Sequence, residues 1–157
     1  CNTSDLINDG TITGNVTNDT GKEINLVENT GTIGGSIANS GSINTFEVSG
    51  DIAGGIANNS NIGTFIVKES VNYKGNGNDR ITQALEVAKD KTLTIGNSGT
   101  LSFESTNGTI NNAGTIAGNL ANVKDSIITS FNNSGTISGN LYNDGHIDTL
   151  SNTGTMG

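Results

Sequence analysis

One nine-residue phrase is repeated along this chain, and the repetition limits what the chain can fold into. "NSGTISGNL" begins at Asn133, and close variants begin at Asn8, Asn29 and Asn112. The apolar positions repeat as well, because five of them recur 19 residues later in the same order. The pairs are Ile33 and Ile52, Ile37 and Ile56, Ile43 and Ile62, Phe46 and Phe65, and Val48 and Val67. Self-similarity at so short a period is typical of solenoids, in which each repeat is one coil.

The spacing of the apolar residues indicates strands rather than helices. A helix needs apolar residues at i, i+3, i+4 and i+7 over about ten residues. Glycine and asparagine interrupt this chain every few positions, leaving short pieces such as "GTI", "GNL" and "TFEV". We therefore predict an all-β parallel β-solenoid with coils of about 19–21 residues. Its coils should stack at about 4.8 Å, the spacing of hydrogen-bonded strands.

The corners of the coils explain the glycines and asparagines. "N-x-G" occurs in register, and its glycine can turn the chain at little steric cost while its asparagine bonds the local backbone. When coils stack, equivalent asparagines can also hydrogen-bond along the axis as a ladder. One position of the repeat is valine in two neighbouring coils, at Val48 and Val67. The same position is asparagine in two other neighbouring coils, at Asn133 and Asn152, so identical residues stack on each other. The predicted structural ladder consists of Asn29, Asn39, Asn58, Asn122, Asn133, Asn143 and Asn152.

Composition is consistent with an ordered repeat that has a thin core. Hydrophobic residues make up 31% of the 157 residues and charged residues 14%, with 23 glycines and no proline. A disordered chain of low hydrophobicity is usually rich in charge and proline, and this chain is not. Its net charge of −8 repels phosphate backbones, which disfavours nucleic acid as a partner.

The repeat divides the chain into three stretches of one solenoid domain. Residues 1–67 and 112–157 read as regular coils, and 68–111 as irregular coils with a protruding loop. Within the middle stretch, "KESVNYKGNGNDRITQ" is predicted to leave the coil, and residues 82–90 are compatible with a short helix. "SNTGTMG" opens a new coil at the end without a visible cap, so we expect a fragment of a longer protein. The alternative is a cap formed by a partner chain.

Few residues point to chemistry. His146 is the only histidine and lies where other coils place a solvent-facing threonine, so it predicts neither a metal site nor a catalytic triad. "GNGNDRI" (Gly75–Ile81) resembles part of a calcium-binding nonapeptide but occurs once, which favours a flexible loop. Asp51 replaces threonine in an outward column. The column otherwise holds Thr11, Thr32, Thr115, Thr136 and Thr155. The sequence thus predicts no catalytic residue, no metal and no cofactor.

Two interpretations of Cys1 stay open. A mature bacterial lipoprotein begins with an acylated cysteine, so Cys1 is a candidate lipidation site. Alternatively, the cysteine only marks where the sequenced segment begins. As the single cysteine, it excludes an internal disulfide.

The stacked "N-x-G-T-I-x-G-x-[IL]-x-N" units resemble the passenger domains of bacterial autotransporters, and "VAKDKTLTIGNSGTLSF" resembles linking segments in such passengers. The resemblance covers nearly the whole chain. It implies a right-handed parallel β-helix on the extracellular face of the outer membrane, exported through a C-terminal β-barrel that this sequence lacks. Many members of the family are adhesins or self-associating surface proteins. If Cys1 is acylated, the chain resembles lipoprotein autotransporters, some of which attach to host cells.

Three functions follow as expectations. The favoured one is an adhesin that is not an enzyme and binds a host-cell surface protein or glycan, or a second copy of itself, through many weak contacts along a repetitive face. The first alternative is a polysaccharide-active β-helix enzyme, which needs clustered acids in a cleft. The second is a passive spacer stalk whose active part lies elsewhere.

Overall fold

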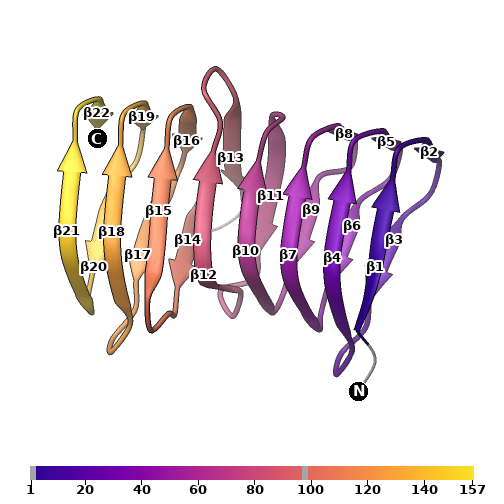
Figure 1. Ribbon diagram of the computed structural model, residues 1–157, viewed down its shortest axis with the longest axis horizontal. Coiled ribbons are helices and arrows are strands. Elements are labelled where there is room, and N and C mark those ends of the chain that lie inside the picture. Colours follow the sequence, from indigo (N-terminus) through magenta and orange to yellow (C-terminus); the bar gives the residue numbers. More distant parts are fainter. Residues whose placement is uncertain (1–2, 97–98) are drawn as a thin grey trace.

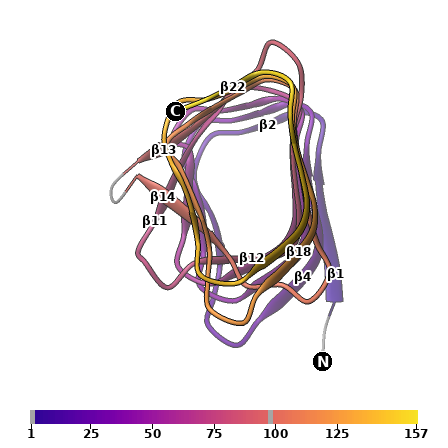
Figure 2. The same cartoon turned by 90° about the vertical axis from the view of Figure 1, so that its left-hand side faces the viewer.

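The structure, a computed structural model, describes residues 3–96 and 99–157 and is a parallel β-solenoid. In Figure 1 the chain rises along the near face, crosses to the far face at the top and descends there. Each turn shifts it from the N-terminal towards the C-terminal end, so the solenoid is right-handed (Figures 1 and 2). The described residues form no helix that could cross a membrane. The predicted fold class is therefore confirmed.

Parallel strands form three sheets that make up the walls of the solenoid. The largest sheet contains β1 (Thr3–Asn8), β4 (Glu23–Asn29), β7 (Ser42–Val48), β10 (Asn61–Val67), β12 (Arg80–Val87), β14 (Thr100–Phe103), β15 (Gly108–Asn112), β17 (Asn119–Asn122), β18 (Ile127–Asn133), β20 (Leu141–Asn143) and β21 (His146–Asn152). The second contains β3 (Val16–Asn18), β6 (Ile37–Asn39), β9 (Ile56–Asn58), β11 (Val71–Gly75), β13 (Thr92–Gly96), β16 (Thr115–Ala117), β19 (Thr136–Ile137) and β22 (Thr155–Met156). The third contains β2 (Thr11–Ile12), β5 (Thr32–Ile33) and β8 (Asp51–Ile52).

The core consists of columns of inward side chains, one from each coil. Ile33 pairs with Ile52 and Phe46 with Phe65, as the 19-residue offset predicts. The rings of Phe46 and Phe65 are tilted, with centroids 5.5 Å apart, and Tyr73 continues the stack at 5.9 Å from Phe65. All three are completely buried. Burial of such side chains stabilises each by about 1.5–3 kcal/mol, so the stacked columns supply most of the stability of a chain poor in apolar residues.

The middle of the chain is more regular than its sequence indicates. Residues 71–75, predicted to leave the coil, form strand β11, and the chain resumes a strand at Arg80. The short helix considered over 82–90 is absent, because this stretch lies largely in β12. Leu85 pairs with Phe65 and Val87 with Val67, so the apolar columns continue through a segment whose local preferences also allow helix. The protrusion is the β12–β13 connection, visible at the top of Figure 1.

The largest sheet branches at β12, because the two ends of this strand pair with different strands of the next coil. The start of β12 pairs with β14 through Ile81 and Phe103, whereas its end pairs with β15 through residues 84–87. On the far wall, β11 and β13 are continuous five-residue strands where the regular coils have a glycine corner. Val71 pairs with Leu93 in the column that leads to Ile116. The two regular halves are therefore joined by coils of different cross-section.

Candidate interaction surface

The buried asparagines form four separate ladders. Their side chains are joined by Nδ2–H···Oδ1 hydrogen bonds of 2.8–2.9 Å between neighbouring coils. The ladders are Asn8–Asn29; Asn18–Asn39–Asn58; Asn112–Asn133–Asn152; and Asn122–Asn143. All seven residues predicted for one ladder take part, but they are distributed over the four.

Sequence reasoning left Asn8, Asn18 and Asn112 out of the ladder. Asn8 and Asn112 carry the same "N-x-G" signal as five of the seven predicted members, the exceptions being Asn58 and Asn122. Asn18 does not, because "NDTG" places one more residue before its glycine, and only its pairing with Asn39 reveals it. The ladder asparagines lie at two different corners of the coils, which a list of motif positions does not distinguish.

The ladder amides also hold the backbone of the corners. Asn133 donates to the carbonyl of Gly135 in its own coil at 3.3 Å and to that of Thr155 in the next at 2.9 Å. Asn112 makes the equivalent bonds to Gly114 and Thr136. The ladder side chains are thus directed into the wall, and most are buried. They stabilise the solenoid, and the buried ones are not available to a partner.

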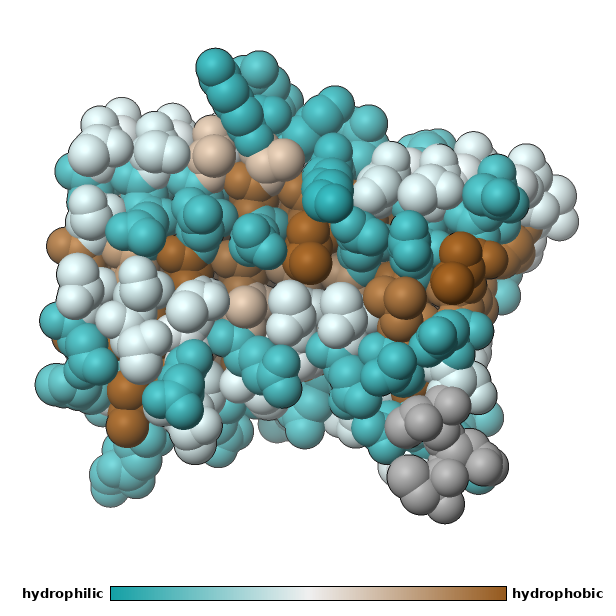
Figure 3. Space-filling view, in the orientation of Figure 1, coloured by the Kyte–Doolittle hydropathy of each residue, from teal (hydrophilic) through white to brown (hydrophobic). Residues whose placement is uncertain are grey.

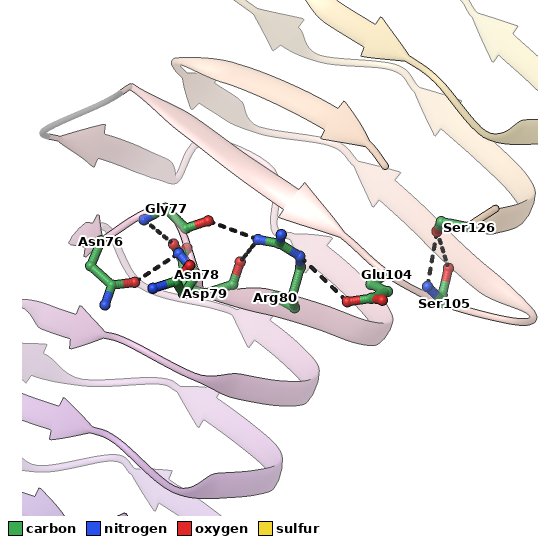
Figure 4. A network of polar contacts seen from close by, with 8 residues as sticks. All are labelled: Asn76, Gly77, Asn78, Asp79, Arg80, Glu104, Ser105 and Ser126. Atoms are coloured by element: carbon green, nitrogen blue, oxygen red, sulfur yellow. Dashed lines mark hydrogen bonds and ion pairs between the residues drawn. The ribbon is translucent and has the colours of Figure 1, made fainter. Parts of the chain in front are cut away.

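The ladder that begins at Asn18 ends in a buried polar cluster. Asn58 donates to the Tyr73 hydroxyl at 3.0 Å, and that hydroxyl donates to Asp79 Oδ2 at 2.6 Å. Gly77 N–H donates to Asp79 Oδ1 at 3.0 Å, and Arg80 donates to the carbonyl oxygens of Gly77 and Asp79 (Figure 4). Asp79 is only 2% exposed. "GNGNDRI" is therefore a turn closed by its own aspartate. In the described part of the chain, no three His, Cys, Asp or Glu side chains are placed so that they could hold a metal ion together.

This cluster predicts an alkaline loss of stability. Burial, together with the hydrogen bond to Asp79, raises the pKa of Tyr73 far above its usual value. The unfolded phenol ionises near pH 10 while the folded one stays protonated, so stability is complete below about pH 10 and falls as the pH rises further. We expect denaturant midpoints to decline above that pH. Tyr73→Phe should be less stable at neutral pH but decline less steeply, and an equal decline in both proteins would contradict the assignment.

The outward side chains of eight strands of the largest sheet form a long surface, which we call the front face. The strands are β1, β4, β7, β10, β12, β15, β18 and β21. This face is turned towards the viewer in Figure 3, where polar side chains predominate around a band of apolar ones. One row consists of Ile7, Glu28, Glu47, Ile66, Glu86, Asn111, Asn132 and Ser151. The next consists of Asp5, Leu26, Thr45, Thr64, Ala84, Thr109, Ser130 and Thr149.

The charge of both rows changes along the solenoid axis, from acidic in the N-terminal part to neutral in the C-terminal part. The N-terminal part carries Glu28, Glu47 and Glu86, and Glu47 pairs with Lys68 at 2.6 Å. The hydrogen bond and the charge of Glu47 raise the pKa of Lys68. From Thr109 onward the rows hold only threonine, serine and asparagine. This part of the front face offers uncharged donors and acceptors at the regular spacing of the coils.

The predicted outward threonine column is divided between two sheets. Thr11, Thr32 and Asp51 pair in the three-stranded sheet, whereas Thr115, Thr136 and Thr155 follow Thr92 in the second. All are at least partly exposed.

His146 is exposed, and its Nε2 lies 2.7 Å from Asp148 Oδ1. It lines a surface hollow of about 350 Å³ together with Asp125 and Asp144. Among the described residues, this hollow brings together the acids and the imidazole that a polysaccharide-active enzyme would require. All three side chains are exposed, and none of the three is held by a buried partner.

Cys1, the candidate lipidation site, lies outside the described residues. Neither family models, nor curated proteins, nor solved structures give a match to this chain.

Proposed function

We propose that this chain is a segment of a surface-exposed autotransporter passenger that acts as an adhesin through its front face. The observation that supports this most directly is the length and regularity of that face, on which outward side chains repeat through eight coils in register. A partner that contacts several coils at once can bind firmly although each contact is weak. The partner is a host-cell surface protein or glycan, or a second copy of the chain.

The location proposed for such a passenger is the extracellular face of the outer membrane, with the lipid at Cys1 as anchor. Uncharged amides and hydroxyls suit this role, because they hydrogen-bond a partner without the cost of burying charge. In the C-terminal part of the two rows they also replace the acidic side chains that contribute to the net charge of −8 elsewhere.

Added charge on the front face is expected to weaken attachment severalfold. Asn111→Lys combined with Asn132→Lys places two ammonium groups in neighbouring coils of one row, where a docked partner would have to desolvate them. The matched control is Thr20→Lys with Thr106→Lys, which adds the same charge in exposed corners off the face. The measurement is binding of purified protein, coupled to beads, to epithelial cells and to itself.

The outcomes of this experiment are distinct. Equal loss in both double variants would show that the front face is not the contact surface. Wild-type beads that attach no better than beads carrying an inert protein would remove the adhesin proposal. A screen of neutral and acidic polysaccharides tests the enzymatic alternative, because turnover that depends on Asp125 or Asp144 would place that activity in the hollow beside His146. A passive spacer would show neither attachment of the beads nor turnover of a polysaccharide.

A further inference from the structure

The stacking of coils is interrupted at one place on the upper wall. Strand β8 is the last of the three-stranded sheet, and the following coil does not pair with it there. Upstream, Asp51 N–H donates to the carbonyl of Gly31 in the coil before. At the equivalent position one coil later, Ser70 N–H donates instead to its own neighbour, Glu69 Oε1, at 3.1 Å. The backbone ladder is therefore open between β8 and the start of β11.

A hollow of about 210 Å³ lies at this opening. β8, β11 and β13 line it, and their outward polar side chains are Asp51, Ser70, Asn72, Thr92 and Thr94. Ser70 Oγ is occupied, since it accepts a hydrogen bond from Thr92 N–H at 3.0 Å. The side chains of Asp51, Asn72 and Thr94 are exposed, and within the described chain they have no hydrogen-bond or ion-pair partner. Three different polar groups thus border one small hollow with their bonding capacity unused.

We propose that this hollow binds one neutral sugar unit of a glycan. A carboxylate only accepts hydrogen bonds, so Asp51 suits a pair of neighbouring sugar hydroxyls. Asn72 and Thr94 both donate and accept, as the remaining ring hydroxyls require. The hollow is below the roughly 300–1,000 Å³ of sites for drug-sized ligands, which limits it to one ring.

Charge excludes acidic sugars as its preferred ligands. Asp51 would face an anionic group directly, and no lysine lines the hollow. Lys91, next to the lining residue Thr92, is already paired with Glu69 at 3.0 Å, and Lys74 lies two residues beyond Asn72, outside the lining. The position of the hollow also suits an extended glycan, since threonine columns lead away from it on both sides: Thr11 and Thr32 in one direction, and Thr115, Thr136 and Thr155 in the other. A chain bound at the hollow could therefore contact hydroxyls of neighbouring coils.

This inference rests on the proposed adhesin function and adds to the front face a second contact surface on the upper wall, with a neutral sugar as its ligand. Its test is titration of ¹⁵N-labelled protein with the methyl glycosides of glucose, galactose, mannose and N-acetylglucosamine, with methyl glucuronide as the anionic comparison. We expect at least one neutral glycoside to shift the amide signals of residues 51, 72 and 94 with a Kd on the order of 1 mM. The glucuronide should bind more weakly.

Asp51→Ala should weaken this binding by about tenfold or more, because it removes hydrogen bonds to a charged group. Its melting temperature should not change, since the carboxylate holds no other part of the fold. Asp9→Ala, which removes an exposed aspartate from a different corner, is the matched control and should bind like the wild type. Absence of shifts with every neutral glycoside, preference for the glucuronide, or unaltered binding by Asp51→Ala would each overturn the proposal.

The sugar site and the adhesin can fail separately. If the wild-type beads attach to cells but the hollow binds no glycoside, the sugar site is wrong and the adhesin stands. If the hollow binds a glycoside but the beads attach to nothing, the site stands and the adhesin is wrong.

Discussion

Gly135→Ala is expected to destabilise the solenoid by about 3 kcal/mol or more and to lower its melting temperature by roughly 10 °C. Gly135 lies at a corner between β18 and β19, and a Cβ there would overlap the carbonyl oxygen of Gly114 in the coil before. That oxygen accepts the Thr136 N–H at 2.8 Å, so it cannot move without breaking a bond between coils. The clash is with backbone, and no change of rotamer relieves it. Thermal unfolding followed by circular dichroism measures the effect.

The same repeat position provides the control. Gly10 corresponds to Gly31, whose Cβ would overlap the Gly10 carbonyl, but a Cβ on Gly10 itself would have no atom within 4 Å. Gly10→Ala should therefore change the melting temperature by no more than a few degrees. Comparable losses in the two variants would mean that the corner glycines are needed for their intrinsic flexibility. In that case the close approach of stacked coils would not explain the "N-x-G" repeat.

The regular coils could be predicted from sequence because their apolar positions and corner motifs recur in several coils. A column such as Ile33 and Ile52 is defined by a fixed offset, and the offset also fixes which side chains face inward. The like-on-like pattern of Val48 and Val67 has a physical reason as well. A buried asparagine between two valines would have no amide to bond in the neighbouring coils. Asn112 illustrates this cost on one side: it pairs with Val87 of the preceding coil, and its Oδ1 has no hydrogen-bond partner.

The middle coils could not be predicted because their corners lack the sequence motif of the regular coils. β11 and β13 replace a glycine corner with a continuous strand, and nothing local distinguishes "VNYKG" from a loop. Pairing with β9 on one side and β13 on the other keeps this segment in the wall. The buried Asp79 was missed for the same reason, because its partner Tyr73 lies six residues away in a stretch without a repeat.

The proposed sugar site arises from this irregularity. The missing pairing after β8 leaves a hollow that Asp51 and Asn72 both line. Asp51 stands out in the sequence as the one acidic residue in a threonine column. Its surroundings, however, depend on how two unlike coils meet. The sequence repeat thus predicts the solenoid and its repetitive face, whereas the missing pairing after β8 creates the hollow proposed to bind a sugar.

Asn39→Ala is expected to destabilise the protein by about 2–4 kcal/mol, because three partners, two of them buried asparagines, lose a hydrogen bond together. Asn39 is completely buried in the middle of its ladder. Its Oδ1 accepts from Asn18 at 2.9 Å, and its Nδ2 donates to Asn58 Oδ1 at 2.9 Å and to the Asn61 carbonyl at 3.1 Å. The midpoint of denaturant unfolding measures the effect.

The matched control for Asn39→Ala is Asn59→Ala, since Asn59 is an exposed asparagine in the adjacent coil. Its side chain has no hydrogen-bond partner within the described residues, so its loss should shift the midpoint very little. A ladder also implies coupling between its members. Once Asn39 is alanine, Asn58 has already lost one bond along the axis, so a second substitution at Asn58 should cost less than it does alone. Additive losses would mean that each asparagine acts only on its own corner and that stacking of the amides contributes nothing.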